Sequence, residues 1–341
     1  MQSTARLLAF RPKPYEDELF SSWLVRVAHS QGIKLQTFCN VMWPGKAIWN
    51  RDSDRCDDEQ FLSSLAEKTG TTIDAARATL LGSFSGTLFP TLVRSGNTRW
   101  IMPVGIYHRV RRRFGLQYCP DCLSSGDPYF RRIWRLSLFT FCQRHMRELK
   151  DCCAGCGGPI LLHRGEMGSR RRVVPVSRAI CWSCGCDLRQ ALRTAAIKPA
   201  LARQQALHLR LLNGGSSPFE GLSAAPDYFA ALGQVLKLLA SPLIRLRPFR
   251  RIIAEASGLE MAQSVSYHQA INYFDYLRVR DRMRLLESSA WLFEDWPDRF
   301  RSLCRISGVR SSTLLHDFEE GPAGFIDLVR SASRNWSGRT K

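Results

Sequence analysis

The sequence predicts a mainly helical protein in which helix-turn-helix domains flank two small zinc-binding α+β units. Two observations support this fold class. Apolar residues recur at helical spacing toward both ends of the 341-residue chain. Nine of the 12 cysteines lie between Cys119 and Cys186, most of them in closely spaced pairs. A chain of this length is expected to form two or three domains.

Three domains follow from these patterns. We assign residues 1–115 to an N-terminal helical, helix-turn-helix-like domain, residues 116–190 to a tandem zinc-binding domain, and residues 191–341 to a C-terminal helical, helix-turn-helix-like domain. Hydrophobic residues make up 45% of the chain and charged residues 23%, which is ordinary for a folded protein. The sequence contains no run of 18 apolar residues and no apolar stretch typical of a secretion signal.

The first domain contains two helix-turn-helix outlines. Apolar residues from Leu19 to Ala28 form one helical face, Gly32 ends it, and a short helix is expected from Leu35 to Met42. In the second outline an apolar stripe ends at Gly70, and Thr71 with Asp74 gives a capping box for a helix from Ile73 to Leu81. Each outline is equally compatible with an ordinary helical hairpin.

The C-terminal domain carries two further amphipathic helices, expected over residues 228–239 and 273–286. Two groups of arginines accompany them, Arg278, Arg280, Arg282 and Arg284 on the second helix and Arg245, Arg247, Arg250 and Arg251 upstream of it. The first group wraps around its helix, since alternate positions do not share a face. These arginines are either a binding surface or a solvated helix face.

The first zinc unit is predicted by two pairs of ligand residues. Cys119 and Cys122 form a C-x2-C pair, and Cys142 and His145 follow after 19 residues as a C-x2-H pair. Three thiolates and an imidazole suit tetrahedral zinc. If a helix begins at Cys142, His145 lies on the same face. Between the pairs, the alternation from Trp134 to Leu138 predicts a half-buried strand.

A second zinc unit follows directly. Cys153 with Cys156 and Cys181 with Cys184 form two C-x2-C pairs separated by 24 residues. Together they make a four-cysteine site of the ribbon type, so we expect two structural zinc ions per chain. Cys152 and Cys186 are left over, and each is either an alternative ligand or a small buried residue. Reduced, buried cysteines are the other interpretation of the whole block.

No catalytic motif accompanies the zinc units. Both ligand sets are already complete with four residues, whereas a catalytic zinc keeps a position for water. The sequence lacks H-E-x-x-H, and the deaminase pattern is absent because Tyr118 rather than proline precedes Cys119. Gly45 and Lys46 are followed by Ala47 and do not form a Walker A loop. We therefore expect no enzyme activity, although a nuclease with carboxylates far apart in sequence leaves no local pattern.

The charge balance favours an anionic partner. The chain has 49 basic and 30 acidic residues, a formal net charge of +19. Candidate contacts to phosphates or to an acidic partner protein are the arginines in and beside the zinc units: Arg109, Arg111, Arg112, Arg113, Arg131, Arg132, Arg170, Arg171 and Arg172.

The N-terminal and zinc segments resemble the TniQ family of transposon target-selection proteins, which includes TnsD. The opening resemblance is the stretch from Pro12 to Ala28 with its Ser-Ser-Trp-Leu core at residues 21–24. The first zinc unit resembles that of the family through Tyr118 to Cys122, Tyr129 to Arg131, Trp134 to Leu136, and the Cys142 and His145 pair. The second matches through its four cysteines and residues 187–189, and residues 291–300 resemble a recurring C-terminal element.

The resemblance implies a non-enzymatic transposition factor. Such a protein would link target DNA, or a CRISPR RNA-guided ribonucleoprotein effector, to the AAA+ ATPase that recruits transposase, in some relatives as a homodimer. It would act on the nucleoid in the bacterial cytoplasm. The alternative is a stand-alone zinc-containing transcription regulator that binds an operator through helix-turn-helix units. The sequence does not specify the target, the targeting route or the oligomeric state.

Overall fold

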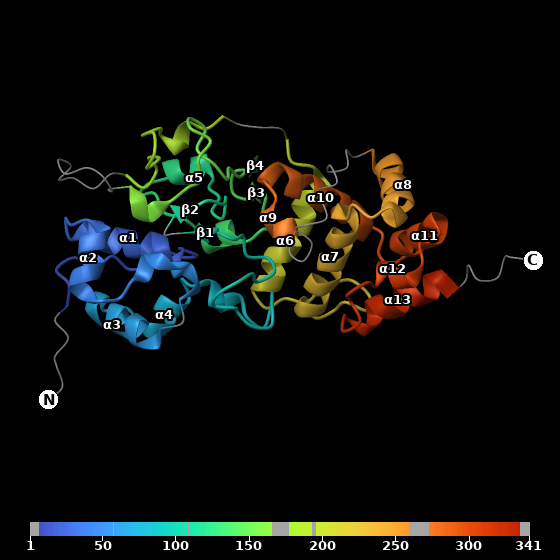
Figure 1. The fold of residues 1–341 in the computed structure, drawn as a ribbon, viewed down its shortest axis with the longest axis horizontal. Helices are drawn as coiled ribbons and strands as arrows, with labels where there is room; N and C mark the ends of the chain where they lie inside the picture. Colours follow the sequence, from blue (N-terminus) through green and yellow to red (C-terminus); the bar gives the residue numbers. More distant parts are fainter. Residues whose placement is uncertain are drawn as a thin grey trace, which may run out of the picture. The chain divides into compact units, whose positions relative to one another are not determined.

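The computed structural model of the chain describes residues 7–56, 58–107, 110–165, 177–192, 196–258 and 273–334. It forms two compact units. The first comprises Met1–Ser85 and Thr91–Ala195, and the second comprises Gly86–Pro90 and Ala196–Lys341. The first unit contains both the N-terminal helices and the cysteine-rich segment, whereas the second is helical (Figure 1).

Four helices begin the first unit: α1 (Phe20–Ser30), α2 (Leu35–Met42), α3 (Glu59–Thr69) and α4 (Ile73–Arg77). The first two confirm the helices predicted there, and Gly32 separates them with φ +71°. Trp23, Leu24, Phe38, Phe61 and Leu65 meet in one core at 2% exposure or less. Burial of these apolar faces is what fixes such short helices, because isolated helices of this length are marginal in water.

The second outline differs from the prediction at its N-cap. Gly70 ends α3 in the left-handed conformation, as expected of a C-terminal glycine. Thr72 rather than Thr71 caps α4, with its hydroxyl accepting from the Ala75 amide at 3.2 Å. The helix stops at Arg77 and is replaced by a 3₁₀ turn at Leu81–Phe84. The helix expected as far as Leu81 is therefore wrong in length, although its start at Ile73 is confirmed.

The cysteine-rich segment is built from short elements. Two hairpins, β1 (Ile106–Tyr107) with β2 (Val110–Arg111) and β3 (Phe141–Cys142) with β4 (Arg147–Glu148), accompany the helix α5 (Pro120–Ser124). The predicted strand at residues 134–138 is wrong, because a 3₁₀ helix occupies Arg132–Arg135. Cys142 does not start a helix either. It ends β3, and His145 lies in the turn of the hairpin, since C-x2-H spacing suits a turn as well as a helix.

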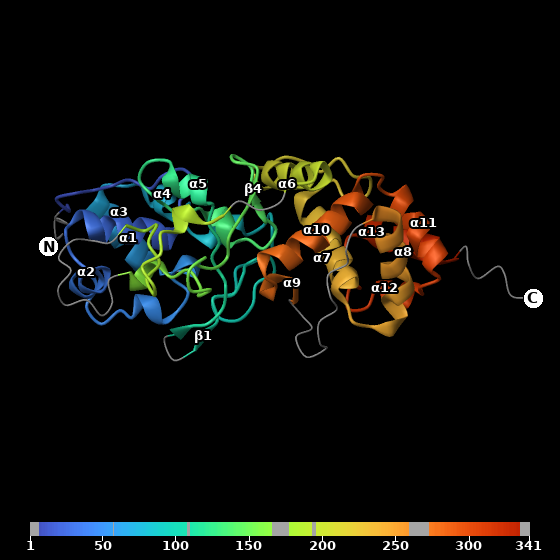
Figure 2. The same ribbon diagram turned by 90° about the horizontal axis from the view of Figure 1, so that it is seen from above.

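The second unit is a helical assembly (Figure 2) of α6 (Pro199–Leu212), α7 (Ala225–Ala240), α8 (Arg247–Ser257), α9 (Tyr273–Tyr276), α10 (Val279–Phe293), α11 (Asp298–Ser307), α12 (Ser311–Leu314) and α13 (Ala323–Arg334). Helix α10 packs against both α6 and α7. The helix predicted over 228–239 is confirmed as the buried part of α7. The helix predicted over 273–286 is divided between α9 and α10, and Arg282 is fully buried instead of solvated.

A polar group lies inside this second unit. His208 Nε2 is 3.0 Å from the Tyr228 hydroxyl, and both side chains are fully buried. Burial lowers the pKa of His208 to about 3, so the imidazole is neutral at physiological pH. The neutral ring therefore stabilises the unit as a hydrogen-bonding group and not as a charge.

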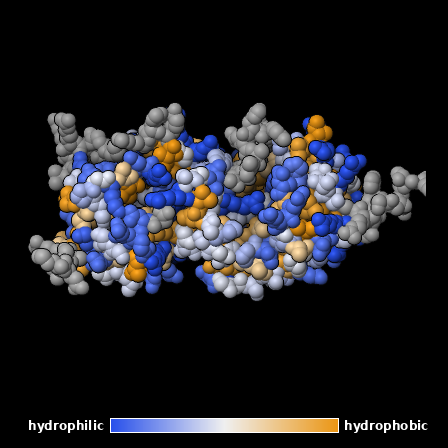
Figure 3. Space-filling model, turned by 60° about the horizontal axis from the view of Figure 1, so that its bottom comes forward, coloured by the Kyte–Doolittle hydropathy of each residue, from blue (hydrophilic) through white to orange (hydrophobic). Residues whose placement is uncertain are grey.

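On the face drawn in Figure 3, hydrophobic residues form small, separate patches among hydrophilic ones. Within the described ranges, no single helix has the length and hydropathy required to span a bilayer. Helix α7 and residues Ile244–Ser257 meet that requirement only when taken together, and the chain bends by 106° between them.

Candidate metal centres

The first cluster combines a short helix and a hairpin turn. Cys119 is the N-cap of α5, Cys122 lies within it, and Cys142 and His145 come from the β3–β4 hairpin. His145 Nδ1 is 3.4 Å from Cys119 Sγ, 3.3 Å from Cys122 Sγ and 3.5 Å from Cys142 Sγ. The sulfurs of Cys122 and Cys142 are 3.6 Å apart. The four predicted ligands therefore converge on one point.

These distances fit a tetrahedral zinc ion. Zn–S bonds of about 2.3 Å and Zn–N bonds of about 2.0 Å place two sulfurs about 3.8 Å apart and a sulfur and a nitrogen about 3.5 Å apart. Three thiolates and one imidazole are a donor set that zinc prefers. The residues present therefore fit the metal that the sequence predicts.

The thiols of this cluster are electrostatically coupled. Hydrogen bonds with Cys122 and Cys142, followed by burial, raise the pKa of Cys119 far above that of a free thiol. Hydrogen bonds from Cys119 and Cys122 lower the pKa of Cys142 strongly. One thiolate is thus stabilised by its neighbours, whereas several buried thiolates together require a cation.

The first cluster is enclosed by the fold. Cys119, Cys122 and Cys142 are buried. Tyr118 and Lys150 exchange two backbone hydrogen bonds of 2.8 and 2.9 Å, which join the residue before Cys119 to the segment that follows β4. Arg147 donates to Asp121 at 2.7 Å, and this pair connects the hairpin to α5 directly. Both halves of the ligand set are therefore held by contacts other than the metal.

The second cluster is formed by two similar turns. Cys153 Sγ lies 3.6 Å from Cys184 Sγ, and Cys156 Sγ lies 3.8 Å from Cys181 Sγ. These distances again fit tetrahedral zinc, here with four thiolates. In each turn the glycine after the second cysteine, Gly157 or Gly185, has a positive φ, 67° or 76°, which glycine adopts without strain.

The two spare cysteines lie beside this second cluster. The four converging thiols include that of Cys153 and not that of Cys152, in agreement with the two-residue spacing to Cys156. The Cys152 carbonyl accepts from the Tyr118 hydroxyl at 3.2 Å, and its backbone pairs with Pro159. Cys186 pairs with Cys181 through a 2.8 Å backbone hydrogen bond and stands at the end of the second turn.

A buried ion pair connects α1 to the first metal segment. Glu18 accepts from Arg26 Nη2 at 2.7 Å and from the Ser22 hydroxyl at 2.9 Å. The Ser22 hydroxyl in turn accepts from the Phe130 amide at 3.0 Å, and the Leu19 amide donates to the Phe130 carbonyl at 2.7 Å. The conspicuous residues of the N-terminal signature thus form intramolecular contacts that hold α1 against the segment between the two ligand pairs.

A second buried network involves Arg135. Its guanidinium donates to Asp52 and to Asp54, each at 2.6 Å, and all three side chains are largely buried. Burial raises the pKa of Asp54, whereas for Asp52 the charge and hydrogen bonds of Arg135 outweigh burial and lower the pKa. Sequence analysis missed these partners because more than 80 residues separate Arg135 from either aspartate.

The predicted basic contacts fall into four groups. Arg109, Arg170, Arg171 and Arg172 lie outside the described residues. Arg112 and Arg113 are exposed. Arg111 is buried and donates to the Arg51 carbonyl at 3.3 Å, so it is not part of an exposed basic surface. Arg131 lies 5.0 Å from the Tyr129 ring, and Arg132 pairs with Asp17 at 3.3 Å.

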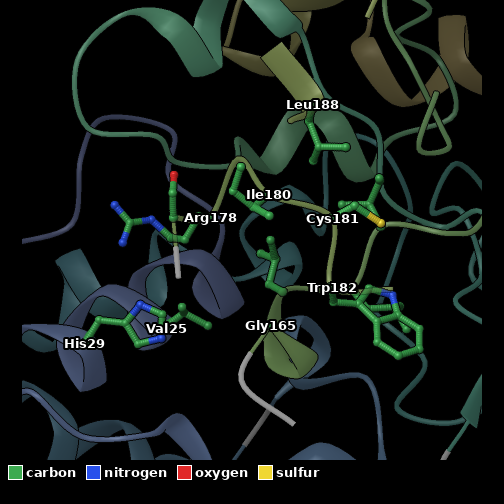
Figure 4. A pocket seen from close by; sticks show the side chains of 12 residues that line it. Val25, His29, Gly165, Arg178, Ile180, Cys181, Trp182 and Leu188 are labelled. Carbon is green, nitrogen blue, oxygen red and sulfur yellow. The ribbon is translucent and has the colours of Figure 1, made fainter. Parts of the chain in front are cut away.

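One pocket between α1 and the second metal segment is small. The pocket in Figure 4 places Val25 and His29 of α1 on one side and Ile180, Cys181 and Trp182 on the other. Its volume of about 20 Å³ admits a water molecule and nothing larger. Trp182 is partly exposed, with the Arg164 guanidinium 5.6 Å from its ring, a pairing that spacing rules did not indicate.

The fold and sites define a class: a largely helical protein with small two-stranded sheets and two Cys/His clusters that can hold metal ions. Residues 9–149 match the family model TniQ, so this segment is a TniQ domain, and it contains the signature residues that resemble the family. A search of curated proteins gave no match. The matched segment contains the whole first cluster and ends before Cys153, so the second cluster lies outside it.

Proposed function

We propose that the protein is a non-enzymatic transposition targeting factor that links target DNA, or an RNA-guided effector complex, to an AAA+ ATPase. The observation that carries the proposal is the TniQ domain over residues 9–149, a family that acts in transposition. Within that domain the signature residues bury their polar groups against each other, as the Glu18–Arg26 pair shows. They build a scaffold, and the partner-binding groups lie on its surface.

The metal centres serve this scaffold. Each cluster offers four soft or borderline donors, which fill a tetrahedral zinc ion and leave no position for a reacting water. Zinc bound there would supply folding free energy to short segments that lack a large core. Two structural zinc ions per chain are therefore part of the proposal.

Direct DNA contact is supported by charge. The chain carries a formal net charge of +19, and Arg112 and Arg113 are exposed beside the first metal segment. The helix pairs α1–α2 and α3–α4 have the outline of helix-turn-helix units, with glycine at each turn. We assign these groups to nucleic-acid or partner binding.

Co-purification with its transposon neighbours tests the function most directly. The tagged protein should retain the ATPase, and its deletion should abolish targeted transposition. Retention of no ATPase together with normal transposition would refute the proposal. A footprint confined to a promoter, with transposition unaffected, would instead identify a transcription regulator.

Salt dependence tests the DNA contact separately. Arg112→Ala with Arg113→Ala should reduce the slope of log affinity against log salt by about 2, because each phosphate contact contributes about 0.9. The matched control is Arg189→Ala with Arg203→Ala, since Asp187 and Glu294 already pair with those arginines. An unchanged slope in the first variant would assign Arg112 and Arg113 to a solvated surface.

A further inference from the structure

The second cluster contains more thiols than a metal ion needs. Four cysteines converge there, and Cys186 lies immediately beside them. Its thiol donates to the Asp187 carbonyl at 3.8 Å, and it is close enough to the thiols of Cys153 and Cys184 to interact with both electrostatically. In the first cluster the matching pairs, Cys119 with Cys122 and Cys142 with His145, have no such neighbouring cysteine in the sequence.

Gly155 permits the approach of Cys186. A Cβ atom at this position would stand 3.0 Å from Cys186 Cβ, 3.3 Å from its Sγ and 3.5 Å from Cys184 Sγ. The sulfurs of Cys184 and Cys186 therefore flank the same small volume beside the Cys153–Cys156 turn. Any side chain at residue 155 would clash with Cys186. Glycine is the one residue that avoids this contact, because it has no Cβ atom.

The surroundings leave room for exchange. Cys156 and Cys184 are exposed and Cys186 is partly exposed, whereas the cysteines of the first cluster are buried. Gly185, which separates Cys184 from Cys186, has the freedom to change its backbone conformation. A shift within this exposed turn disturbs no apolar core, because its neighbours Ser183, Cys184 and Gly185 are exposed as well.

We propose that Cys186 is an alternative ligand of the second metal centre, which takes the coordination position of Cys184. The exchange is balanced: the Cys186 thiol gives its proton to the departing Cys184 sulfur, and one metal–sulfur bond replaces another. The centre thus has two coordination forms, with spacing C-x2-C or C-x4-C from Cys181. This inference rests on the proposed binding of metal at the second cluster.

Metal content of purified variants tests the exchange. With zinc as the probe, Cys184→Ser should still hold two ions per chain, whereas Cys184→Ser with Cys186→Ser should hold one. Cys184→Ser with Cys152→Ser is the matched control and should hold two. If Cys184→Ser alone holds one ion, Cys186 is not a ligand. A wild-type protein without zinc would instead refute the metal centres themselves.

Gly155→Ala keeps every ligand and tests the geometry. Combined with Cys184→Ser, it should reduce the zinc content from two ions to one, because the added methyl displaces Cys186. Gly155→Ala alone should keep two ions, since Cys184 remains. If the combined variant still holds two zinc ions, Cys186 does not approach the metal past residue 155 and the proposed geometry is wrong.

Alkylation of the folded wild-type protein avoids variants that fail to fold. Native mass spectrometry after limited iodoacetamide treatment should find chains with one label at Cys184 or at Cys186 that still hold two zinc ions. If a label at Cys184 always accompanies the loss of one ion, the exchange does not occur.

Discussion

The two metal centres share a ligand geometry and differ in their surroundings. The first has three buried thiols and lies in the segment that the buried Glu18 and Ser22 contacts connect to α1. The second has two exposed thiols, two glycine turns and two spare cysteines. The TniQ match contains the first and ends before the second. We conclude that the first centre is part of the domain core and that the second is a peripheral unit.

The largest expected difference is in stability. Cys119→Ser should remove one zinc ion and destabilise the first unit by about 3–5 kcal/mol, because the α1 contacts depend on the segment that this centre fixes. Cys156→Ser should also remove one ion but leave the helices α1 to α4 folded. Elemental analysis and urea unfolding followed by circular dichroism measure both effects. Equal loss of helical signal in the two variants would contradict the comparison.

The next largest difference is expected between two ion pairs, one near each centre, in how much they stabilise the folded protein. Arg135→Ala leaves Asp52 and Asp54 buried without their partner and should cost about 3–5 kcal/mol of unfolding free energy. Arg189→Ala removes the pair with Asp187 beside the second cluster and should cost less than about 1 kcal/mol. Chemical denaturation measures the unfolding free energy of each variant. A loss of less than about 1 kcal/mol in Arg135→Ala would refute the expected difference.

A pH-dependent effect is expected at Asp17. Burial raises its pKa to about 6 against the opposing charges of Arg132 and Arg131. Because the pKa of Asp17 is higher in the folded state than the unfolded value of 3.8, the protonated carboxyl group favours the folded state. This contribution to the free energy of unfolding is complete below about pH 4 and is lost as the pH rises through about 6. Asparagine adopts the left-handed φ of 57° found at residue 17, so Asp17→Asn should keep the backbone conformation. Since its amide does not titrate, this variant should not lose stability over that pH range.

The Asn variant should therefore gain about 1–3 kcal/mol relative to the wild type between pH 4 and pH 7. Urea unfolding at both pH values measures the difference. A constant offset between the two proteins would mean that Asp17 does not titrate in this range.

The smallest effects concern the turns. Met146 occupies in the first cluster the position that Gly157 and Gly185 occupy in the second, and its φ is 45°. Met146→Gly should relieve strain and leave stability unchanged or raised by up to about 1 kcal/mol. Gly157→Ala and Gly185→Ala should each cost about 1 kcal/mol. Thermal unfolding of the zinc-bound proteins checks the opposite signs.

The converging Cys/His residues and the first helices could be predicted from the sequence because their signals are local. Paired spacing identifies Cys119 and Cys122, and apolar periodicity with Gly32 defines α1 and α2. The prediction of a helix at Cys142 is wrong because a spacing of two residues between ligands is compatible with a turn as well as with a helix. Arg111 was expected at the surface, as arginines usually are. Its burial near Asp52 and Asp54 depends on long-range packing, which no local pattern encodes.

X-ray absorption at the zinc edge, combined with metal content, tests the two closed centres most directly. The account predicts two ions per chain and a first shell of four donors on each ion, made only of sulfur and one imidazole nitrogen. Fewer than two ions, or an oxygen ligand in the first shell of either, would contradict it.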